Sequence, residues 1–281
     1  MSHSAGEVET GVPEAVSSVR AELHAPVIRA RSLAKVYGDD PATVVRALDG
    51  VSLDIAHGEH VAIMGASGSG KSTMMNILGL LDVPTSGRYE LNGFDVSAMD
   101  DAQLTVARNR LIGFVFQSFN LIRRTSALAN VELPLAYAGV RPRERRERAL
   151  AALAQVGVAD RAKHLPNELS GGQQQRVAVA RALAGEPALI LADEPTGNLD
   201  STSTADVLDL LDAVHDAGRT IVVITHEDEV AERASRVIRM RDGKIIEDVR
   251  LEEAPPTREA WTPTASACGG APTGSTAGTS L

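Results

Sequence analysis

The chain has 281 residues, of which 43% are hydrophobic and only 3% are aromatic, and its formal net charge is −9. A chain of this size and composition can form one large domain or two small ones, whose cores are built from aliphatic residues and alanine. The acidic balance argues against a nucleic-acid-binding protein, since such proteins usually carry a basic face. The single cysteine, Cys268, excludes an internal disulfide framework and a cysteine-rich metal site.

Polar segments at both ends of the chain differ in composition from its middle. Residues 1–26 are expected to form a flexible N-terminal tail with a helical stretch at 13–23, and they lack the basic and apolar regions of a secretory signal. Residues 249–281 are rich in proline and small residues, so we expect a disordered C-terminal tail. The folded unit is therefore predicted at 27–248.

The first part of the folded unit has the pattern of three strands and a helix. Alternating apolar residues predict antiparallel strands at 27–36 and 44–55. A short apolar strand at 60–64 runs directly into a glycine-rich loop, and a helix is expected at 73–80. A strand, a loop and a helix in this order form the context that a phosphate-binding loop requires.

Three segments in the middle of the chain have helical patterns, at 100–110, 127–138 and 142–156. We interpret them as a mostly helical insert, a helical subdomain at about 95–167. Arginines at 141–148 alternate with glutamates, which favours a solvated helix face over a nucleic-acid-binding surface.

Short strands and helices alternate in the rest of the folded unit, as is typical of a parallel sheet with helices on both faces. The apolar runs are too short to span a bilayer, so any work at a membrane requires a separate partner chain. The expected elements are helices at 173–183 and 201–215, strands at 188–192 and 220–224, and a hairpin of 236–240 and 244–247.

Residues 65–72 fit the phosphate-binding pattern G-x-x-x-x-G-K-[ST]. Glycines let backbone N–H groups approach phosphate oxygens, and the helix that follows adds its positive N-terminal end. Lys71 would bring a positive charge to the β- and γ-phosphates, and the Ser72 hydroxyl would coordinate Mg²⁺. The flanking strand and helix disfavour the alternative, a merely flexible turn. The predicted nucleotide-binding residues here are Gly65, Ala66, Ser67, Gly68, Ser69, Gly70, Lys71, Ser72 and Thr73.

Two carboxylates, Asp193 and Glu194, follow the buried strand predicted at 188–192. The carboxyl ends of parallel strands open onto the ligand crevice of such a sheet. Asp193 is therefore a candidate Mg²⁺ ligand, and Glu194 is positioned to polarise the water that attacks the γ-phosphate. The alternative is a turn that the two residues merely cap, and the presence of the phosphate loop makes it the weaker interpretation.

Gln117 and His226 also follow apolar strands. The Gln117 amide would reach Mg²⁺ or the attacking water, or would move with the helical insert, although a lone glutamine is usually structural. His226 would donate a hydrogen bond to the γ-phosphate, and its position alone leaves a structural role equally open.

A second glycine-rich segment, formed by Ser170, Gly171, Gly172 and Gln173, precedes an amphipathic helix. Free N–H groups at a helix N-terminus and a serine hydroxyl form a second phosphate-binding surface. Because the chain already has one phosphate loop, this surface makes sense when it serves a nucleotide held by another subunit. A capping box of Ser170 and Gln173 is the structural alternative, and the two roles are compatible.

Over residues 27–247 this set of motifs resembles the ATP-binding subunit of an ABC transporter. The resemblance implies an α/β fold: a P-loop NTPase core with a mostly parallel sheet, an antiparallel β-subdomain and the inserted helical subdomain. It implies that Tyr37 stacks on adenine, that 198–200 is a D-loop, and that His226 is a switch histidine. The catalytic residues it implies are Glu194, His226, Gln117 and Lys71, and the implied Mg²⁺ ligands are Ser72, Gln117 and Asp193.

The same resemblance implies an ATP-dependent dimer of two identical copies. Each ATP would lie between the phosphate loop of one copy and the second glycine segment of the other, and hydrolysis would power an integral-membrane permease on a separate chain, from the cytoplasmic side. Residues 114–122 and 130–135 are similar to the lipoprotein-releasing and macrolide-exporting subgroup, which often transmits force. Arg123, Arg124 and Glu227 depart from its pattern, which leaves the coupled permease open.

Two other functions fit parts of the pattern. A regulatory ABC ATPase would use the same ATP-driven dimer to control a membrane partner without transported cargo. Soluble ABC proteins of DNA repair or translation usually have two ATPase units or a long coiled-coil insert, and this sequence has neither.

Overall fold

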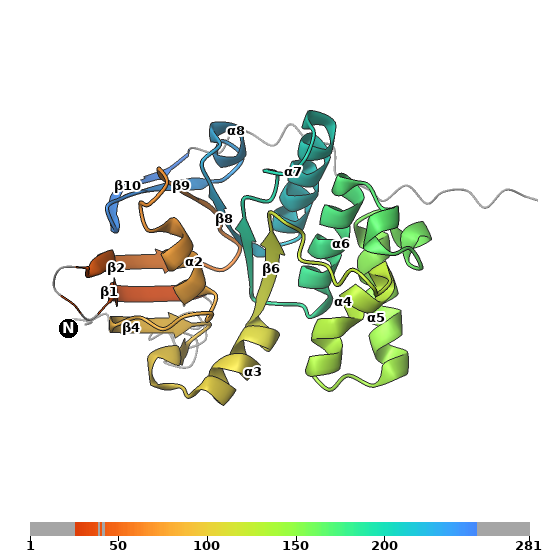
Figure 1. The fold of residues 1–281 in the computed structure, drawn as a ribbon, viewed down its shortest axis with the longest axis horizontal. Helices are drawn as coiled ribbons and strands as arrows, with labels where there is room; N and C mark the ends of the chain where they lie inside the picture. The colour runs from red at the N-terminus through yellow and green to blue at the C-terminus, as the bar shows by residue number, and fades with distance from the viewer. Residues whose placement is uncertain (1–25, 39, 41–42, 252–281) are drawn as a thin grey trace, which may run out of the picture.

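The computed structural model describes residues 26–38, 40 and 43–251 of the chain. Its strands form two sheets, one of four strands and one of six (Figure 1). The strands are β1 (Ile28–Tyr37), β2 (Val45–Ile55), β3 (His60–Met64), β4 (Ser86–Leu91), β5 (Phe94–Asp95), β6 (Ile112–Phe116), β7 (Leu189–Asp193), β8 (Thr220–Thr225), β9 (Arg236–Arg241) and β10 (Lys244–Arg250).

The helices agree with the predicted segments within a few residues, and one short helix, α8, was not predicted. In the described part of the chain, no helix has both the length and the apolar character that crossing a membrane requires. The helices are α2 (Lys71–Leu78), α3 (Asp101–Leu111), α4 (Ala127–Tyr137), α5 (Pro142–Gln155), α6 (Gly171–Ala184), α7 (Ser201–Asp216) and α8 (Asp228–Ala231), with 3-10 turns at Val96–Ala98, Ala159–Arg161 and Pro166–Glu168.

The described residues end later than the predicted folded unit. Strand β10 continues to Arg250, past the predicted limit of 248, because Arg250 pairs with Arg236 of β9 and its guanidinium lies 3.2 Å from Glu59. The backbone N–H of Leu251 also donates to the carbonyl of Ser235. The helical stretch predicted at 13–23, the remaining parts of both predicted tails, and Cys268 lie outside the described residues.

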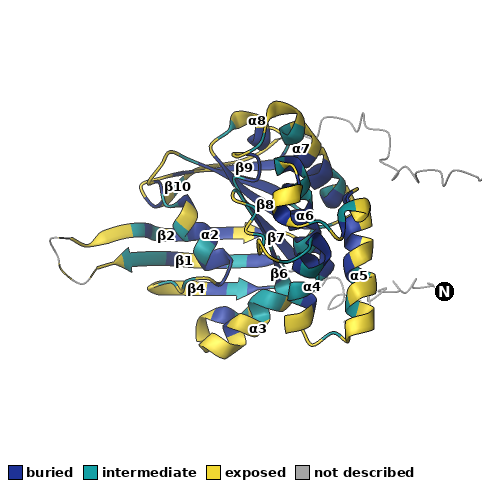
Figure 2. Cartoon of the chain, turned by 45° about the vertical axis from the view of Figure 1, so that its right-hand side comes forward, coloured by how far each residue is buried: buried dark blue, intermediate teal, exposed yellow. Residues whose placement is uncertain are grey.

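The larger sheet has the strand order β10-β9-β3-β8-β7-β6, and its pairs are parallel except for the antiparallel hairpin of β9 and β10. Consecutive side chains of a strand point to opposite faces of the sheet. In β7, Leu189 and Leu191 enter the core that contains α2, whereas Ile190 and Ala192 enter the core that contains α6 and α7. Both faces are covered, so the central strands are apolar between their end residues and appear buried in Figure 2. The predicted parallel sheet with helices on both faces is confirmed.

The smaller sheet is antiparallel, in the order β2-β1-β4-β5, and it forms the predicted antiparallel β-subdomain. Strands β4 and β5 were not predicted from the sequence. The sheet shares its core with α2, the helix that follows the phosphate loop. Tyr89 of β4 is fully buried, and its hydroxyl donates to the carbonyl of Leu78 at the end of α2, with 2.8 Å between the oxygens. This contact anchors the small sheet to the helix that carries the loop.

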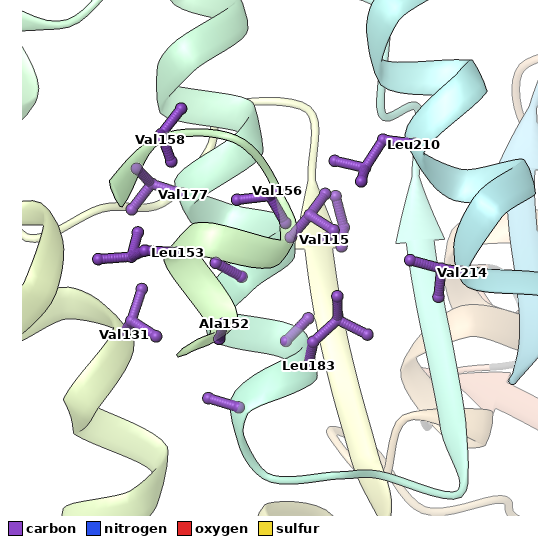
Figure 3. Close-up of a cluster of buried hydrophobic side chains, with 14 of the residues drawn as sticks. Val115, Val131, Ala152, Leu153, Val156, Val158, Val177, Leu183, Leu210 and Val214 are labelled. Carbon is purple, nitrogen blue, oxygen red and sulfur yellow. The ribbon is translucent and has the colours of Figure 1, made fainter. Parts of the chain in front are cut away.

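Helices α4 and α5 lie on the far side of the molecule from the small sheet and pack on α6 (Figure 1). Figure 3 shows their shared core, where Val131 of α4, Leu153 of α5 and Val177 of α6 gather with Val115 of β6. The predicted helical range of about 95–167 therefore also contains β6, the edge strand of the large sheet. Its apolar run belongs in the sheet because side chains on both of its faces enter cores, so the helical layer that packs on α6 consists of α4 and α5.

Candidate active site

A cavity of about 880 Å³ opens where the chain leaves strands β3, β7 and β8. Loops that follow the strands of a parallel sheet collect at one edge, so groups that are distant in the sequence come together there. Most of the residues predicted to bind nucleotide, to bind Mg²⁺ or to act in catalysis line this cavity. They are Tyr37, Ala66, Ser67, Gly68, Gly70, Lys71, Ser72, Thr73, Asp193, Glu194 and His226.

The phosphate loop depends on glycine where it touches its neighbours most closely. Gly70 has a φ of 101°, and a Cβ atom there would lie 2.5 Å from the carbonyl oxygen of Ala47. A Cβ atom on Gly65 would collide with the carbonyl oxygen of Met240. Because glycine fits both positions, the chain turns directly from β3 into α2 and presents the N-terminal N–H groups of that helix to the cavity.

Lys71 is the first residue of α2 and is nearly buried. Its ammonium donates to the carbonyl oxygens of Gly65 and Ala66, at 2.6 and 2.9 Å. Both acceptors belong to the phosphate loop, so the positive charge is held at the loop. The helix begins two residues before the predicted start at 73 because Lys71 and Ser72 themselves form its first turn.

Asp193 is the last residue of β7 and is partly buried. Burial, and then the neighbouring charge of Glu194, raise the pKa of the Asp193 carboxyl above its ordinary value, and Lys71 acts in the opposite direction. A cation beside such a carboxylate favours its charged form. The Asp193 carboxylate and the Ser72 hydroxyl both line the cavity and are oxygen ligands of the kind that Mg²⁺ prefers.

Glu194 has a left-handed backbone conformation, with a φ of 42°, which residues other than glycine rarely adopt. Its N–H donates to the carbonyl of Ile224 at 2.8 Å, and its own carbonyl accepts from the N–H of Gly197 at 3.1 Å. The turn brings Oε1 of Glu194 to 2.7 Å from Nδ1 of His226, the residue that follows β8. The two predicted catalytic residues are therefore in direct contact.

Tyr37 ends strand β1 and forms part of the cavity wall. Its hydroxyl donates to Oδ2 of Asp82 at 2.9 Å, and the ammonium of Lys35 lies 5.0 Å from the centre of its ring. Lys35 also pairs with Asp82 at 2.6 Å. This network holds the aromatic ring in place at the edge of the cavity.

Gln117 is not among the described residues that line the cavity. Its amide packs against Gly197, where an added Cβ atom would lie 2.5 Å from Nε2 of Gln117. The carbonyl of Gln117 accepts from Nδ2 of Asn198 at 3.0 Å. Gln117 follows β6 at the edge of the sheet, so it lies beside the segment after Glu194 instead of beside the phosphate loop.

Two residues of the phosphate loop itself, Gly65 and Ser69, are also not among the described residues that line the cavity. Ser69 is buried, and its hydroxyl has no hydrogen-bond partner within the described part of the chain. Its carbonyl accepts from the N–H of Gly243 at 3.0 Å. Both residues thus form the support of the loop, on the side of β9 and its hairpin turn.

The second glycine segment, Ser170–Gln173, likewise does not belong to the described lining of this cavity. Ser170 caps α6: its Oγ accepts from the N–H of Gln173, and the Gln173 side chain accepts from the N–H of Ser170. The predicted capping box is confirmed. The segment packs against α7, and a Cβ atom on Gly172 would lie 2.8 Å from Oγ of Ser203. One chain therefore holds its two glycine-rich segments in separate places.

Part of the cavity wall was missed by sequence reasoning. The hairpin turn between β9 and β10 reaches the phosphate loop, and the N–H of Asp49 donates to the carbonyl of Gly243 at 2.9 Å. The Asp242-Gly243 pair signals a turn, but no local pattern says what that turn touches. The missed lining residues are Val45, Arg46, Ala47, Ile224, Asp242 and Gly243.

Comparisons with known proteins identify relatives of this chain. The family model described as ABC transporter matches residues 48–197. The macrolide export ATP-binding/permease protein MacB of Hyphomonas neptunium is 54% identical over 240 residues, which cover 84% of this chain and 37% of that protein. The uncharacterized ABC transporter ATP-binding protein YknY of Bacillus subtilis is 56% identical over 199 residues, which cover 71% of this chain and 86% of that protein. The chain thus spans little more than a third of the first relative and most of the second.

Solved structures give the same result. The dimeric structure of MJ0796, a bacterial ABC transporter cassette, matches 81% of this chain and 100% of its own, with 45% identity and a TM-score of 0.73. A structure of MJ0796 described as a dimeric post-hydrolysis state bound to ADP and Pi matches with 44% identity and the same TM-score. The present chain has a P-loop core and a small antiparallel sheet. Together with these matches, they show that the chain belongs to the ABC transporter family, as an ATP-binding cassette.

Proposed function

We propose that this chain binds and hydrolyses Mg-ATP and, as a head-to-tail dimer, powers a membrane permease formed by a separate chain. One observation carries the proposal: a single cavity gathers the phosphate loop, Asp193, Glu194 and His226. The segment Ser170–Gln173 lies elsewhere, against α7. In a dimer, this segment would complete the site of the second copy.

Nucleotide binding follows from the charges and shape of the cavity. The ring of Tyr37 would stack on the adenine, and the phosphates would lie over the loop at residues 65–70. Lys71 would exchange the carbonyls of Gly65 and Ala66 for phosphate oxygens, which carry full negative charge and so bind an ammonium more strongly. The N-terminal end of α2, with Ser72 and Thr73, adds N–H donors and a positive dipole end.

Hydrolysis would use Glu194 and His226 together. The Glu194 carboxylate would accept a proton from the water that attacks the γ-phosphate. Nδ1 of His226 holds that carboxylate at 2.7 Å, and the second ring nitrogen would contact the γ-phosphate. Lys71 would stabilise the charge that develops on the phosphoryl oxygens.

The oxygen ligands in the cavity fit a bound Mg²⁺. Ser72 and Asp193 would coordinate it, and Mg²⁺ would neutralise charge on the β- and γ-phosphates. Gln117 packs against Gly197 in this structure. We propose that Gln117 reaches the cavity when the layer of α4 and α5 moves relative to the large sheet, and that its amide then contacts Mg²⁺ or the attacking water.

The relatives support the partners in this proposal. MacB of Hyphomonas neptunium is described as an ATP-binding/permease protein, and this chain matches 37% of its length. MJ0796 is described as a dimeric cassette, in one structure with ADP and Pi. By analogy, the chain would sit at the cytoplasmic side of the cell membrane as a peripheral subunit, with Ser170, Gly171, Gly172 and Gln173 of one copy facing the nucleotide of the other.

Capture of the partner tests this proposal. The Glu194→Gln variant, loaded with Mg-ATP to favour the closed dimer, is used to isolate bound proteins from solubilised membranes. We expect an integral-membrane permease, and recovery of soluble proteins alone would contradict the proposal. Reconstitution with that permease then separates two roles: ATPase stimulation by a transported compound supports transport, whereas control by the partner without any cargo supports the regulatory alternative.

A further inference from the structure

Gln175 lies in the second turn of α6, and its side chain is fully buried. Nε2 of Gln175 donates to the carbonyl of Pro195 at 2.6 Å and lies 3.4 Å from the carbonyl of Phe116. Phe116 ends β6, and Pro195 lies two residues after the end of β7. The two strands are neighbours in the large sheet. A single amide of α6 thus connects the helix to two adjacent points at the edge of the sheet.

Both acceptors adjoin residues of the candidate site. Phe116 immediately precedes Gln117, and Pro195 immediately follows Glu194. The amide of Gln117 itself packs against Gly197, two residues beyond Pro195. Gln175 therefore links α6, the helix that Ser170 caps, to the backbone beside the contact between Gln117 and Gly197.

The turn at Glu194 needs support from its surroundings. Its φ of 42° is unfavourable for a residue with a side chain, and such conformations persist when neighbouring contacts determine them. Two backbone hydrogen bonds restrain the turn, from Glu194 to Ile224 and from Gly197 to Glu194. The bond from Gln175 to Pro195 is a third restraint, and it comes from a helix instead of from the sheet.

The oxygen of the Gln175 amide, Oε1, destabilises the folded state. Oε1 of Gln175 is buried and has no hydrogen-bond partner within the described residues. A buried acceptor without a partner has lost its hydrogen bonds to water and therefore destabilises the folded state. Reversing the amide would place Oε1 against two carbonyl oxygens, so only the observed orientation can donate to Pro195. An apolar side chain of similar length would avoid the cost, and it would also lose the restraint on the Glu194 turn.

We propose that Gln175 is a positioning residue for hydrolysis: its amide fixes the turn that directs the Glu194 carboxylate. The inference rests on the proposed role of Glu194. Gln175 differs in this from the residues proposed to contact the nucleotide, because it is fully buried and is not part of the described cavity lining. Loss of the amide should slow the chemical step and leave nucleotide affinity unchanged.

The test uses the full chain with Gln175→Met, which keeps the length of the side chain and removes the donor, and Gln175→Asn, which keeps the amide and shortens its reach. Tyr89→Phe is the matched control, since it removes one buried hydrogen bond on the far side of α2. We expect kcat to fall roughly ten- to a hundredfold in both Gln175 variants, with unchanged KM and unchanged affinity for a fluorescent ATP analogue. Tyr89→Phe should lower the melting temperature with little change in kcat.

Amide hydrogen exchange supplies a readout that does not depend on turnover. Both Gln175 variants should exchange faster than the wild type in the peptide that contains residues 194–198, and Tyr89→Phe should not. Wild-type kcat together with wild-type exchange in a folded Gln175 variant would overturn the inference. If Glu194→Gln itself retains full hydrolysis, the proposed role of Glu194 fails. If only Glu194→Gln is inactive and the Gln175 variants are normal, the positioning role alone fails.

Discussion

Nδ1 of His226 lies 2.7 Å from Oε1 of Glu194, although the two residues are 32 positions apart in the chain. They meet because β7 and β8 are neighbouring parallel strands that end at the same edge of the sheet. A carboxylate accepts hydrogen bonds, so Nδ1–H donates to Glu194. A hydrogen bond from the same ring to the γ-phosphate would require a proton on Nε2 as well. The contact fixes the direction of the Glu194 carboxylate in this structure.

Glu194→Gln should nearly abolish ATP hydrolysis while ATP binding remains. An amide cannot take a proton from water, and loss of a general base typically lowers a rate by about a hundredfold or more. The variant should also accumulate as a closed dimer with ATP, measured by size-exclusion chromatography beside a phosphate-release assay. Glu229→Gln, which changes an exposed carboxylate on α8, is the control and should keep wild-type turnover. Full activity of Glu194→Gln would remove Glu194 from its role.

Lys71→Ala should weaken nucleotide binding. The ammonium of Lys71 is held at the phosphate loop by two carbonyls, and the substitution removes the positive charge next to the phosphates. We expect the affinity for Mg-ATP to fall by roughly tenfold or more, since hydrogen bonds to charged groups contribute about 1.5–3 kcal/mol. Isothermal titration calorimetry measures the effect, with the exposed Lys163→Ala as the control. Equal affinity of Lys71→Ala and the wild type would contradict the proposed phosphate contact.

His60 should make the protein less stable in acid. Burial, and then the nearby charge of His215, lower its pKa from 6.5 to about 4. The unfolded chain therefore binds more protons than the folded one between pH 6.5 and pH 4. The stabilisation is fully present above pH 6.5 and is lost as the pH falls toward 4. Between pH 7.5 and pH 5 this single group removes about 2 kcal/mol from the free energy of unfolding.

Urea unfolding at pH 7.5 and pH 5 measures this contribution. His60→Leu lacks the titrating ring, so its free energy of unfolding should fall by about 2 kcal/mol less than that of the wild type over the same interval. Other groups titrate in both proteins, and their contributions cancel in the comparison. An equal loss in the two proteins would show that His60 does not resist protonation in the folded state.

The sequence predicts the cavity well where function depends on backbone geometry. The pattern at residues 65–72 requires a sharp turn between a strand and a helix, and the structure has that turn with Gly70 at a φ of 101°. Asp193 ends one apolar strand and His226 follows another, and these strands are buried, parallel neighbours, so the two residues lie at the same edge of the sheet. These predictions rest on local chemistry and on one rule of sheet topology.

Other parts could not be predicted because they depend on contacts across the chain. A position after a strand does not give the direction of a side chain, so the packing of the Gln117 amide against Gly197 could not be predicted. Strand β4 has a weak alternating pattern, and its pairing with β1 gives it its place. The bond from Gln175 to Pro195 joins two residues whose sequence context carries no signal of a contact.

The central claim is that each ATP is held between two copies of the chain, and a mixing experiment tests it most directly. Ser170→Arg should disable the segment Ser170–Gln173, Lys71→Ala should disable the phosphate loop, and each variant alone should be inactive. Mixed dimers would contain one intact site, formed by Lys71 of one copy and Ser170 of the other. When the two variants are mixed in equal amounts, half of the dimers are mixed, and each mixed dimer has one intact site of its two. Up to about a quarter of the wild-type ATPase rate should therefore return. No recovery, in a mixture shown to contain mixed dimers, would contradict a shared site.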